Sequence, residues 1–421
     1  MKMNGSQILI QALIDQGVDT IFGYPGGSVL NIYDALYERS EDIRHIITSH
    51  EQGAAHAADG YARSTGKCGV CLATSGPGAT NLVTGIATAY MDSIPMVAIT
   101  GNVPNDLLGR DSFQEVNITG ITMPITKHNF IVQNVEDLAA VVRKAFVIAN
   151  SGRKGPVLID IPKDVTAAHS EYVKLPRYRI RKLPKVDDVV FEQALEVIRR
   201  AERPMIYAGG GIISSNATRE LMNFSRHMDI PICCSMMGLG SVPYDYDLYM
   251  GMLGMHGTPV SNYATLNTDL IIAIGSRFSD RVAGNREEFG REAKIIHFDI
   301  DASEISKNVA SDISIVGDAR YILKKMIQRM PETKHDDWTG TLKDFKTKLG
   351  LPKPKPGENV DPRDLALTLH EIVGEDAIIV TDVGQHQMIM AQYYQFSRPR
   401  SWISSCGLGT MGYGMGAAIG A

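Results

Sequence analysis

Short apolar runs alternate with helical patterns along most of this chain, and this alternation constrains the fold more than any other feature. Between residues 1 and 170, five runs have the length and β-branched content of buried strands: TIFGYP, IRHIIT, VCLATS, MVAIT and PVLIDIP. Helical patterns separate them. Strands that alternate with helices pair in parallel, with helices over both faces of the sheet. The sequence therefore predicts an α/β fold built from doubly wound parallel sheets.

Two proline-bearing segments, 171–188 and 351–364, are typical of linkers and divide the chain into three blocks. The second block repeats the alternation from Pro204 onward. The third offers only AIIVTDVG and SWISS as strands, whereas a doubly wound sheet usually has four or more. We expect domains at 1–170, 190–335 and 360–421, with the third one incomplete.

Composition and charge exclude several classes of partner. The formal net charge is −5 and no basic stripe is present, which argues against nucleic acid and against anionic membranes. No apolar run approaches the roughly 18 residues that a membrane span needs. The N-terminus has the pattern of an amphipathic helix, not of a signal peptide. We expect a cytoplasmic enzyme.

The five cysteines raise the alternative of a zinc or redox site. Cys68 and Cys71 form a C-x-x-C pair, but they lie in a predicted strand, whose alternation directs them to opposite faces. Cys233 and Cys234 are adjacent and lack the spacing of a zinc ligand pair. Buried structural thiols are therefore the favoured interpretation.

Three glycine-rich segments could bind a ligand. GYARSTGKC (60–68) is one residue too long for a phosphate loop, and a strand follows it instead of preceding it. Gly407, Gly409 and Gly412 match G-x-G-x-x-G, but the acidic residue expected about 20 positions later cannot be tested. TSGPGATN (74–81) follows a strand and begins a helix. It could be a tight turn or a ligand site, and both interpretations stay open.

Glu51 is the most informative single residue. It follows the predicted strand at 43–48 and begins a helix composed mainly of Ala and Gly. Small residues let another surface approach the backbone closely, so we expect this carboxyl group to contact a large, flat partner. The alternative is a structural one, because a carboxylate at a helix N-terminus is favoured by the helix dipole.

Ten motifs, in order from about residue 4 to the end, resemble the thiamine-diphosphate-dependent acetohydroxyacid (acetolactate) synthase family, in its catalytic subunit. The motifs are GYPGGS (23–28), HEQGAAHAADGYAR (50–63), TSGPGATN, FQE (113–115), KHN (127–129), PVLIDIPKDV (156–165), GMHGT (254–258), GSRFSDRVAG (275–284), DVGQHQ (382–387) and GLGTMGYG (407–414). The resemblance implies decarboxylation of pyruvate and ligation of its hydroxyethyl unit to a second 2-oxo acid, pyruvate or 2-oxobutyrate. This is the first common step of branched-chain amino-acid biosynthesis.

The resemblance also implies roles for individual residues. Glu51 would hydrogen-bond a ring nitrogen of the aminopyrimidine, and it needs desolvated surroundings in order to keep the proton that it donates. Gln114 and Lys127 would form the active-site wall, and the backbone N–H of Gly27 would stabilise developing oxyanion charge. The other cofactor contacts implied are Pro25, Gly26, Val383, Gly384, Gln385, His386, Gly409 and Met411.

For the acceptor acid, the resemblance implies that Arg281 binds the carboxylate and that Phe113 and Met255 line the pocket. The RFSDR segment matches the FAD-binding pattern of the biosynthetic enzymes, which catabolic relatives lack; Ser279 departs from it, because the family usually has Asp there. The flavin would be structural. The implied FAD contacts are Arg153, Gly209, Gly210, Gly211, Met236, Met237, His256, Gly275, Arg277, Arg281, Asp299, Ile300 and Asp318.

The family's G-D-G motif for Mg²⁺ and diphosphate is absent from the sequence. We therefore expect the metal ligands beyond residue 421 and expect the chain as given to be inactive. The alternatives are a catabolic synthase, a pyruvate oxidase-like enzyme or a non-catalytic fragment. The resemblance further implies that the thiamine site lies between the first domain of one subunit and the third domain of another. A homodimer or higher oligomer follows, together with a small regulatory subunit.

Overall fold

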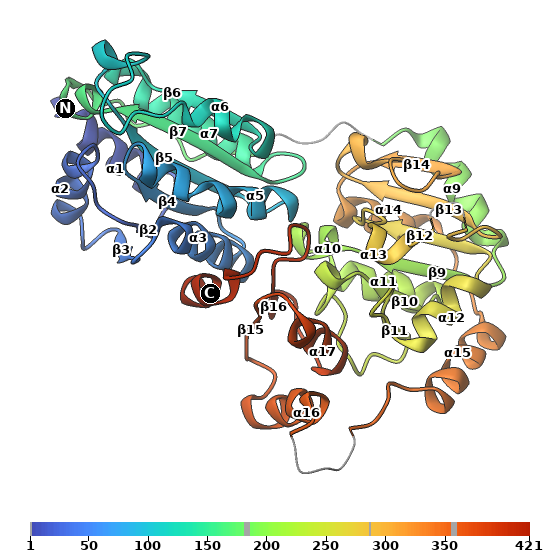
Figure 1. Cartoon of the computed structure of the whole chain (residues 1–421). Coiled ribbons are helices and arrows are strands. Elements are labelled where there is room, and N and C mark those ends of the chain that lie inside the picture. The colour runs from blue at the N-terminus through green and yellow to red at the C-terminus, as the bar shows by residue number, and fades with distance from the viewer. Residues whose placement is uncertain (1, 181–185, 286–287, 355–359) are drawn as a thin grey trace. The chain divides into compact units, whose positions relative to one another are not determined.

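The computed structural model describes residues 2–180, 186–285, 288–354 and 360–421. The chain divides into two compact units: one holds 1–181, 380–383 and 403–421, and the other holds 182–379 and 384–402. Each unit contains a six-stranded parallel sheet (Figure 1). The predicted α/β class is therefore confirmed. The predicted linkers at 171–188 and 351–364 fall partly on 181–185 and 355–359, outside the described residues.

The sheet of the first unit has the strand order β3-β2-β4-β5-β7-β6. From β2 the chain continues to β3 on one side, whereas β4 and the later strands lie on the other. The order thus reverses between β2 and β4, and in doubly wound sheets ligands bind at the carboxyl ends of the strands where this happens. The bounds are β2 Thr20–Gly23, β3 Arg44–Ile47, β4 Gly69–Ala73, β5 Met96–Asn102, β6 His128–Ile131 and β7 Pro156–Pro162.

Helices cover both faces of this sheet (Figure 1). One face carries α1 (Gly5–Asp15), α2 (Leu30–Glu38) and α7 (Leu138–Asn150), and the other carries α3 (Glu51–Thr65), α4 (Pro77–Asn81) and α5 (Val83–Met91). The smaller elements are β1 Lys2–Asn4, which pairs with β8 His169–Glu171, η1 Asn105–Leu107, α6 Ile118–Thr122, η2 Met123–Ile125, η3 Val135–Asp137 and α8 Lys163–Ala167.

Helix α3 forms because it is rich in alanine, the residue with the highest helix propensity. His50 caps its N-terminus, since its ring nitrogen Nδ1 accepts from the backbone N–H of Gln52 at 3.1 Å. Gly66, with φ at 74°, ends it. Helix α18 (Tyr413–Gly420) packs along α3 so closely that a Cβ on Gly60 would lie 2.1 Å from the carbonyl oxygen of Ala417. The small residues of both helices make this backbone approach possible.

The sheet of the second unit has the strand order β11-β10-β9-β12-β13-β14, so its reversal lies between β9 and β12. Its strands are β9 Pro204–Ala208, β10 Ile232–Cys234, β11 Tyr249–Met252, β12 Leu270–Ile274, β13 Lys294–Asp299 and β14 Ile313–Val316. The helices are α9 Asp188–Arg200, α10 Gly210–Ser214, α11 Thr218–Met228, η4 Met236–Gly238, α12 Pro259–Asn267, α13 Asp280–Ala283, η5 Ala302–Glu304, α14 Ala319–Arg329, α15 Asp336–Lys348, α16 Pro362–Val373 and α17 Gln385–Tyr393.

The segment 360–421 is shared between the units. Helices α16 and α17 belong to the second, whereas α18 belongs to the first. Two short strands of this segment, β15 (Ile379–Val380) and β16 (Trp402–Ile403), pair in a two-stranded sheet. The boundaries of three domains stay a prediction.

Cys68 and Cys71 lie on opposite faces of the sheet of the first unit, as the strand pattern predicts. Cys68 packs with α1 and α7, and Cys71 packs with α3. Burial raises the pKa of both thiols to about 12, so neither is a ready nucleophile. Over the described ranges, no group of three or more His, Cys, Asp or Glu residues could hold a metal ion. Nor does any helix there have the length and apolar character needed to cross a membrane.

Candidate functional site

Two turns meet at the strand reversal of the first sheet. Residues 23–28 follow β2 and residues 74–78 follow β4. The hydroxyl oxygens of Ser28 and Thr74 lie 2.9 Å apart, and the backbone N–H of Ser75 donates to Ser28 Oγ at 3.0 Å. A Cβ on Gly26 would lie 2.5 Å from the Thr74 side chain. Glycine is therefore required at residue 26, and the two turns form one rigid rim.

Glu51 lies at this rim. It is the first residue of α3 and only 8% exposed. Its Oε2 accepts a hydrogen bond from Asn81 Nδ2 at 2.9 Å, and a Cβ on Gly78 would lie 3.1 Å from its Oε1. The TSGPGATN segment is thus more than a tight turn, because it supplies both the donor to Glu51 and the wall beside it. Sequence reasoning missed Asn81; its place as the last residue of that motif was the available signal.

Two glycines near Glu51 in the sequence or on the rim have open space at the side-chain position. A Cβ added at Gly27 or at Gly53 would meet nothing within 4 Å, in contrast to Gly26. Gly27 lies on the 23–28 turn of the rim. Gly53 lies in the first turn of α3, where residues two apart, such as Glu51 and Gly53, point in different directions.

Gln114 is joined to the same rim through its backbone. A Cβ on Gly76 would lie 2.7 Å from the carbonyl oxygen of Gln114, and both residues have positive φ, 60° and 58°. Glu115 holds this loop by accepting from the backbone N–H groups of Ser112, at 2.9 Å, and Gly109. These N–H groups lower the pKa of Glu115. Phe113, next to Gln114, is 88% exposed.

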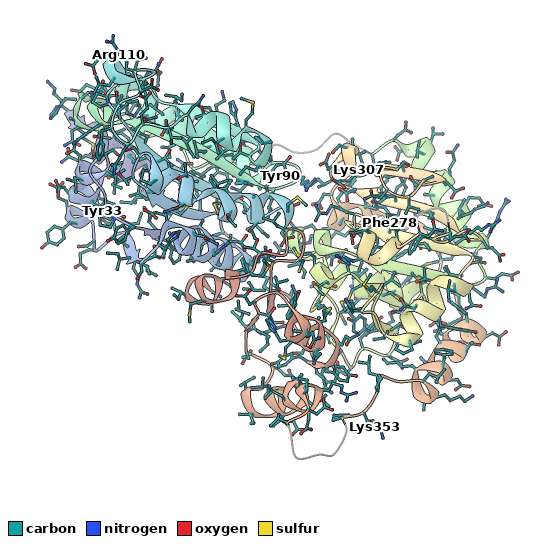
Figure 2. The ribbon with its side chains drawn as sticks, viewed as in Figure 1. Tyr33, Tyr90, Arg110, Phe278, Lys307 and Lys353 are labelled. Carbon is teal, nitrogen blue, oxygen red and sulfur yellow. The ribbon has the colours of Figure 1, made fainter. Side chains whose placement is uncertain are left out.

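Lys127 and Arg153 make other contacts. Lys127 Nζ donates to the carbonyl oxygens of Ser151, at 2.6 Å, and Ile148, at the C-terminal end of α7, where a cation is favoured by the helix dipole. Arg153 Nε donates to Ser93 Oγ at 2.8 Å. Its guanidinium lies 5.9 Å from the ring centre of Tyr90, which Figure 2 labels in α5. The roles predicted for both residues stay predictions.

The C-terminal residues predicted to contact thiamine diphosphate are divided between the units. Val383, Gly409 and Met411 belong to the first unit, whereas Gly384, Gln385 and His386 belong to the second. Asp382 fixes the end of the 407–414 segment, because its carboxylate accepts from the backbone N–H of Gly412 at 2.9 Å. Met411 itself is 74% exposed.

In the second unit, the strand reversal is closed by glycines. A Cβ on Gly209 would lie 2.0 Å from the carbonyl oxygen of Gly275, and one on Gly211 would lie 2.6 Å from the Cα of Gly275. Gly210 faces Met237 of the Met236–Gly238 turn. Ser276, which follows Gly275, is buried, and its hydroxyl has no hydrogen-bond partner among the described residues. The loops after β9 and β12 thus press backbone against backbone and leave a buried polar atom beside them.

The remaining residues predicted to bind FAD make local contacts. Asp299 accepts from the backbone N–H of Asp301 at 2.9 Å, and Asp318 caps α14 by accepting from Tyr321 at 3.0 Å. Ile300 follows Asp299 at the end of β13. The carbonyl oxygens of Arg277 and His256 accept from the side-chain amides of Asn308 and Gln392.

Two of the three predicted acceptor-pocket residues lie together. The backbone N–H of Met255 donates to the carbonyl oxygen of Arg281 at 2.8 Å, and Arg281 Nη1 lies 3.9 Å from Met255 Sδ. Both side chains are exposed. Phe113 belongs to the other unit.

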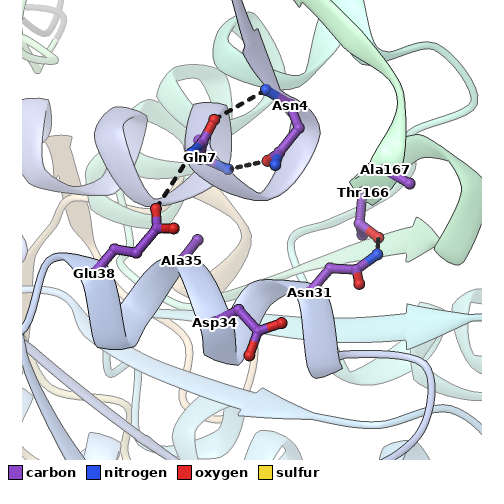
Figure 3. Close-up of a pocket in the computed structure, with 8 residues that line it drawn as sticks. All are labelled: Asn4, Gln7, Asn31, Asp34, Ala35, Glu38, Thr166 and Ala167. Carbon is purple, nitrogen blue, oxygen red and sulfur yellow. Dashed lines mark hydrogen bonds between the residues drawn. The ribbon is translucent and has the colours of Figure 1, made fainter.

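A separate polar pocket lies between α1, α2 and the end of α8 (Figure 3). Hydrogen bonds from Asn31 to Thr166 at 2.9 Å and from Gln7 to Glu38 at 3.2 Å cross its wall. Its lining residues are Asn4, Gln7, Asn31, Asp34, Ala35, Glu38, Thr166 and Ala167, and none of them is a predicted site residue.

Comparison with known proteins decides the family. The chain matches three thiamine pyrophosphate enzyme domains: the N-terminal TPP binding domain over residues 3–121, the central domain over 191–326 and the C-terminal TPP binding domain over 382–421. It is 47% identical to the acetolactate synthase large subunit of Buchnera aphidicola, over 99% of this chain and 75% of that one. The chain belongs to the acetolactate synthase large subunit family. The family predicted from the motifs is therefore confirmed.

The family extends across distant organisms. A probable acetolactate synthase large subunit of Methanocaldococcus jannaschii is 49% identical over 100% of this chain and 73% of its own length. The chloroplastic acetolactate synthase of Arabidopsis thaliana is 46% identical over 99% of this chain and 63% of its own length. The N-terminal domain match includes Glu51 and both rim turns, and the central domain match includes the glycine-lined strand reversal of the second unit.

Proposed function

We propose that the intact enzyme containing these residues catalyses the acetolactate synthase reaction, in which pyruvate loses carbon dioxide and its remaining two carbons are joined to a second 2-oxo acid, pyruvate or 2-oxobutyrate. This is the first common step of branched-chain amino-acid biosynthesis. The observation that carries the proposal is Glu51: it is buried at the strand reversal and hydrogen-bonded to Asn81. The relatives named above are all acetolactate synthases.

The residues around Glu51 fit thiamine diphosphate. Glu51 is a buried carboxyl group at the carboxyl ends of the strands, and the open side-chain position of Gly27 leaves room on the adjoining turn. When bound, thiamine diphosphate supplies an electron sink for the decarboxylation. Glu51 would hold the proton at the ring nitrogen and Asn81 would orient Glu51, while Gln114 and the backbone N–H of Gly27 would face the reacting substrate.

The second unit fits a dinucleotide such as FAD. Gly209, Gly211 and Gly275 bring the loops after β9 and β12 together at the reversal, where such ligands bind, and the Ser276 hydroxyl offers an unused polar group. The flavin would be structural. Arg281 would bind the acceptor carboxylate through its planar guanidinium, with Met255 packed against it.

The wider assembly is part of the same proposal. Because the relatives are named large subunits, we infer a small regulatory partner. We also propose that the protein forms a homodimer, binds Mg²⁺ and is located in the cytoplasm. A pyruvate oxidase activity would contradict the proposal. Such an activity would appear as catalytic reduction of bound flavin by pyruvate.

The deciding experiment uses the intact enzyme and measures loss of the thiazolium C2 proton from thiamine diphosphate by NMR, with Mg²⁺ and FAD present. Glu51→Gln should slow this exchange by about 10²- to 10⁴-fold, the range for removing a general acid–base. Glu38→Gln, an exposed carboxylate of α2, is the matched control and should leave the rate unchanged. Equal rates in Glu51→Gln and the wild-type chain would remove Glu51 from its role and the proposal with it.

A further inference from the structure

A buried ionic network lies in the first unit, away from Glu51. Arg63, in the last turn of α3, is 8% exposed, and the carboxylates Asp59 and Asp92 are 0% and 5% exposed. Arg63 Nε donates to Asp59 Oδ1 at 2.5 Å, and Arg63 Nη2 donates to Asp92 Oδ2 at 2.8 Å. The Tyr413 hydroxyl donates to Asp59 Oδ1 at 2.5 Å. These four residues are called the Arg63 network below.

The network holds a loop, residues 404–412, that links β16 to α18. Arg63 Nη1 donates to the carbonyl oxygen of Ser404 at 3.1 Å. Asp92 accepts from the backbone N–H groups of Cys406, at 3.0 Å, and Gly407, at 2.7 Å. Tyr413 fixes the other end through Asp59. Both ends of the loop are therefore attached to the same buried charges.

The middle of the loop has one buried anchor and one exposed side chain. The Thr410 hydroxyl lies 2.7 Å from that of Thr88 in α5, and Thr410 is 6% exposed. Its neighbour Met411 is 74% exposed. Gly409, with φ at 69°, lies in the turn between Gly407, which donates to Asp92, and Thr410. The loop is thus fixed at defined points while Met411 is directed to solvent.

Stability alone is a weak reason for such a network. Taking one guanidinium and two carboxylates out of water costs several kcal/mol per ion, and packed apolar residues of similar volume often stabilise a fold better. Here the excess negative charge of the two carboxylates is matched by two backbone N–H groups of the loop, from Cys406 and Gly407, and by the Tyr413 hydroxyl at the start of α18. Burial opposes the charge on Arg63, but Asp59, Tyr413 and Asp92 outweigh it and raise the pKa of the guanidinium well above its ordinary value. The charges therefore define where the loop lies.

We propose that Arg63 is a positioning residue for cofactor binding: with Asp59 and Asp92 it fixes the 404–412 loop so that Gly409 and Met411 are held where they contact thiamine diphosphate. This inference rests on the proposed function, in which those two residues contact the cofactor. Arg63 acts only through the loop, because its own guanidinium is buried among Asp59, Asp92 and Ser404.

The experiment compares the wild-type chain with Arg63→Met and Asp92→Asn. Lys67→Met is the matched control, because Lys67 follows the same helix and pairs with Asp19 in an exposed contact that does not reach the loop. Two readouts are needed. Amide hydrogen exchange reports protection of Cys406 and Gly407 without any cofactor. Calorimetry with Mg²⁺ and thiamine diphosphate, on the intact enzyme, gives the dissociation constant, and kinetics gives kcat at saturating cofactor.

We expect Arg63→Met and Asp92→Asn to lose protection at Cys406 and Gly407 and to weaken thiamine diphosphate binding by about 10- to 100-fold, the effect of losing one charge-assisted hydrogen bond. At saturating cofactor, kcat should change far less. Lys67→Met should match the wild type in both readouts. Tyr413→Phe, which keeps every charge, should show the same trend more weakly and serves if Arg63→Met folds poorly.

Three outcomes would overturn the inference: unchanged protection of the loop, unchanged cofactor affinity despite lost protection, or equal effects from Lys67→Met. Failure of the proposed function is distinguishable, because it would show in the wild-type chain. A wild-type enzyme that does not bind thiamine diphosphate contradicts both proposals. If the wild-type enzyme binds thiamine diphosphate no more tightly than Arg63→Met, only the inference about Arg63 is contradicted.

Discussion

The two halves of α3 have almost the same composition but opposite surroundings. In the first turn, a Cβ added at Gly53 would meet nothing within 4 Å. Further along, a Cβ on Gly60 would lie 2.1 Å from the carbonyl oxygen of Ala417, and one on Gly420 of α18 would lie 1.8 Å from the carbonyl oxygen of Ala57. Glycine thus has an open side-chain position at one end of α3 and lets two helix backbones touch at the other.

This difference corrects a simple interpretation of the sequence. A helix of Ala and Gly after Glu51 suggests that the whole helix approaches a flat partner. The structure assigns most of those small residues to packing against α18 and the sheet, and Gly53 alone has an open side-chain position, although a Cβ on Gly416 of α18 would lie 3.0 Å from its carbonyl oxygen. The residues that can contact a ligand are therefore fewer than the pattern indicates, and mutations can separate the two uses of glycine.

The largest effect is expected at the packed end. Gly60→Ala places a methyl group against the backbone of α18, which cannot move without displacing that helix. Overpacking of this kind costs about 3 kcal/mol, and the roughly 1 kcal/mol that alanine gains in helix propensity offsets only part of it. Denaturant unfolding should show a net loss of about 2 kcal/mol. Unchanged stability would mean that α18 does not pack on α3 in solution.

A somewhat smaller effect is expected for Tyr413→Phe, which tests the same packed end through a hydrogen bond instead of a methyl group. The variant removes an uncharged donor to Asp59, the hydroxyl at 2.5 Å, and leaves the ring in place. Losing a hydrogen bond to a charged group should lower the free energy of unfolding by about 1.5 kcal/mol. Tyr263→Phe, in the second unit, is a matched control and should change little.

His56 makes the packed end sensitive to pH. It is 1% exposed, with its ring 5.2 Å from that of Tyr413, and burial lowers its pKa, against the opposing effects of Asp59 and Asp382. Since its pKa is about 6.5 in the unfolded chain, the unfolded state binds the proton first as the pH falls. The contribution of His56 to the free energy of unfolding should therefore be constant above about pH 6.5 and decrease below it. His56→Gln should reduce the decrease, part of which comes from His45 and His297, whose pKa values burial also lowers. An identical pH profile in both proteins would contradict this role of His56.

Much of the fold could be predicted from the sequence, because central strands of a parallel sheet are buried on both faces and give continuous apolar runs. The exceptions in the two large sheets are edge strands. In β6, His128 and Ile131 are exposed, so the run is mixed. In β11, Gly251 interrupts the run with φ at 95°, and no β-branched residue is present. Neither strand has the pattern that a buried strand requires.

The site was partly predictable for a related reason. Glu51 and the glycine turns are local signals, since each lies directly after a strand. Asn81 and the Arg63 network depend on contacts between distant segments. The i,i+4 pair of Asp59 and Arg63 is visible in the sequence, but nothing local indicates that Asp92 and Tyr413, 29 and 350 residues away from Arg63, complete the same cluster. Long-range ion pairs appear only once the fold is known.

The smallest effect on stability is expected at the open end, and there its sign reverses. Gly53→Ala adds a methyl group that meets nothing within 4 Å, so the gain in helix propensity should raise the free energy of unfolding by about 0.5–1 kcal/mol. Denaturant unfolding measures this gain, and a variant that is more stable than the wild type would show that the side-chain position of Gly53 is open in solution. If Gly53→Ala instead destabilised the chain as Gly60→Ala does, the two halves of α3 would be alike.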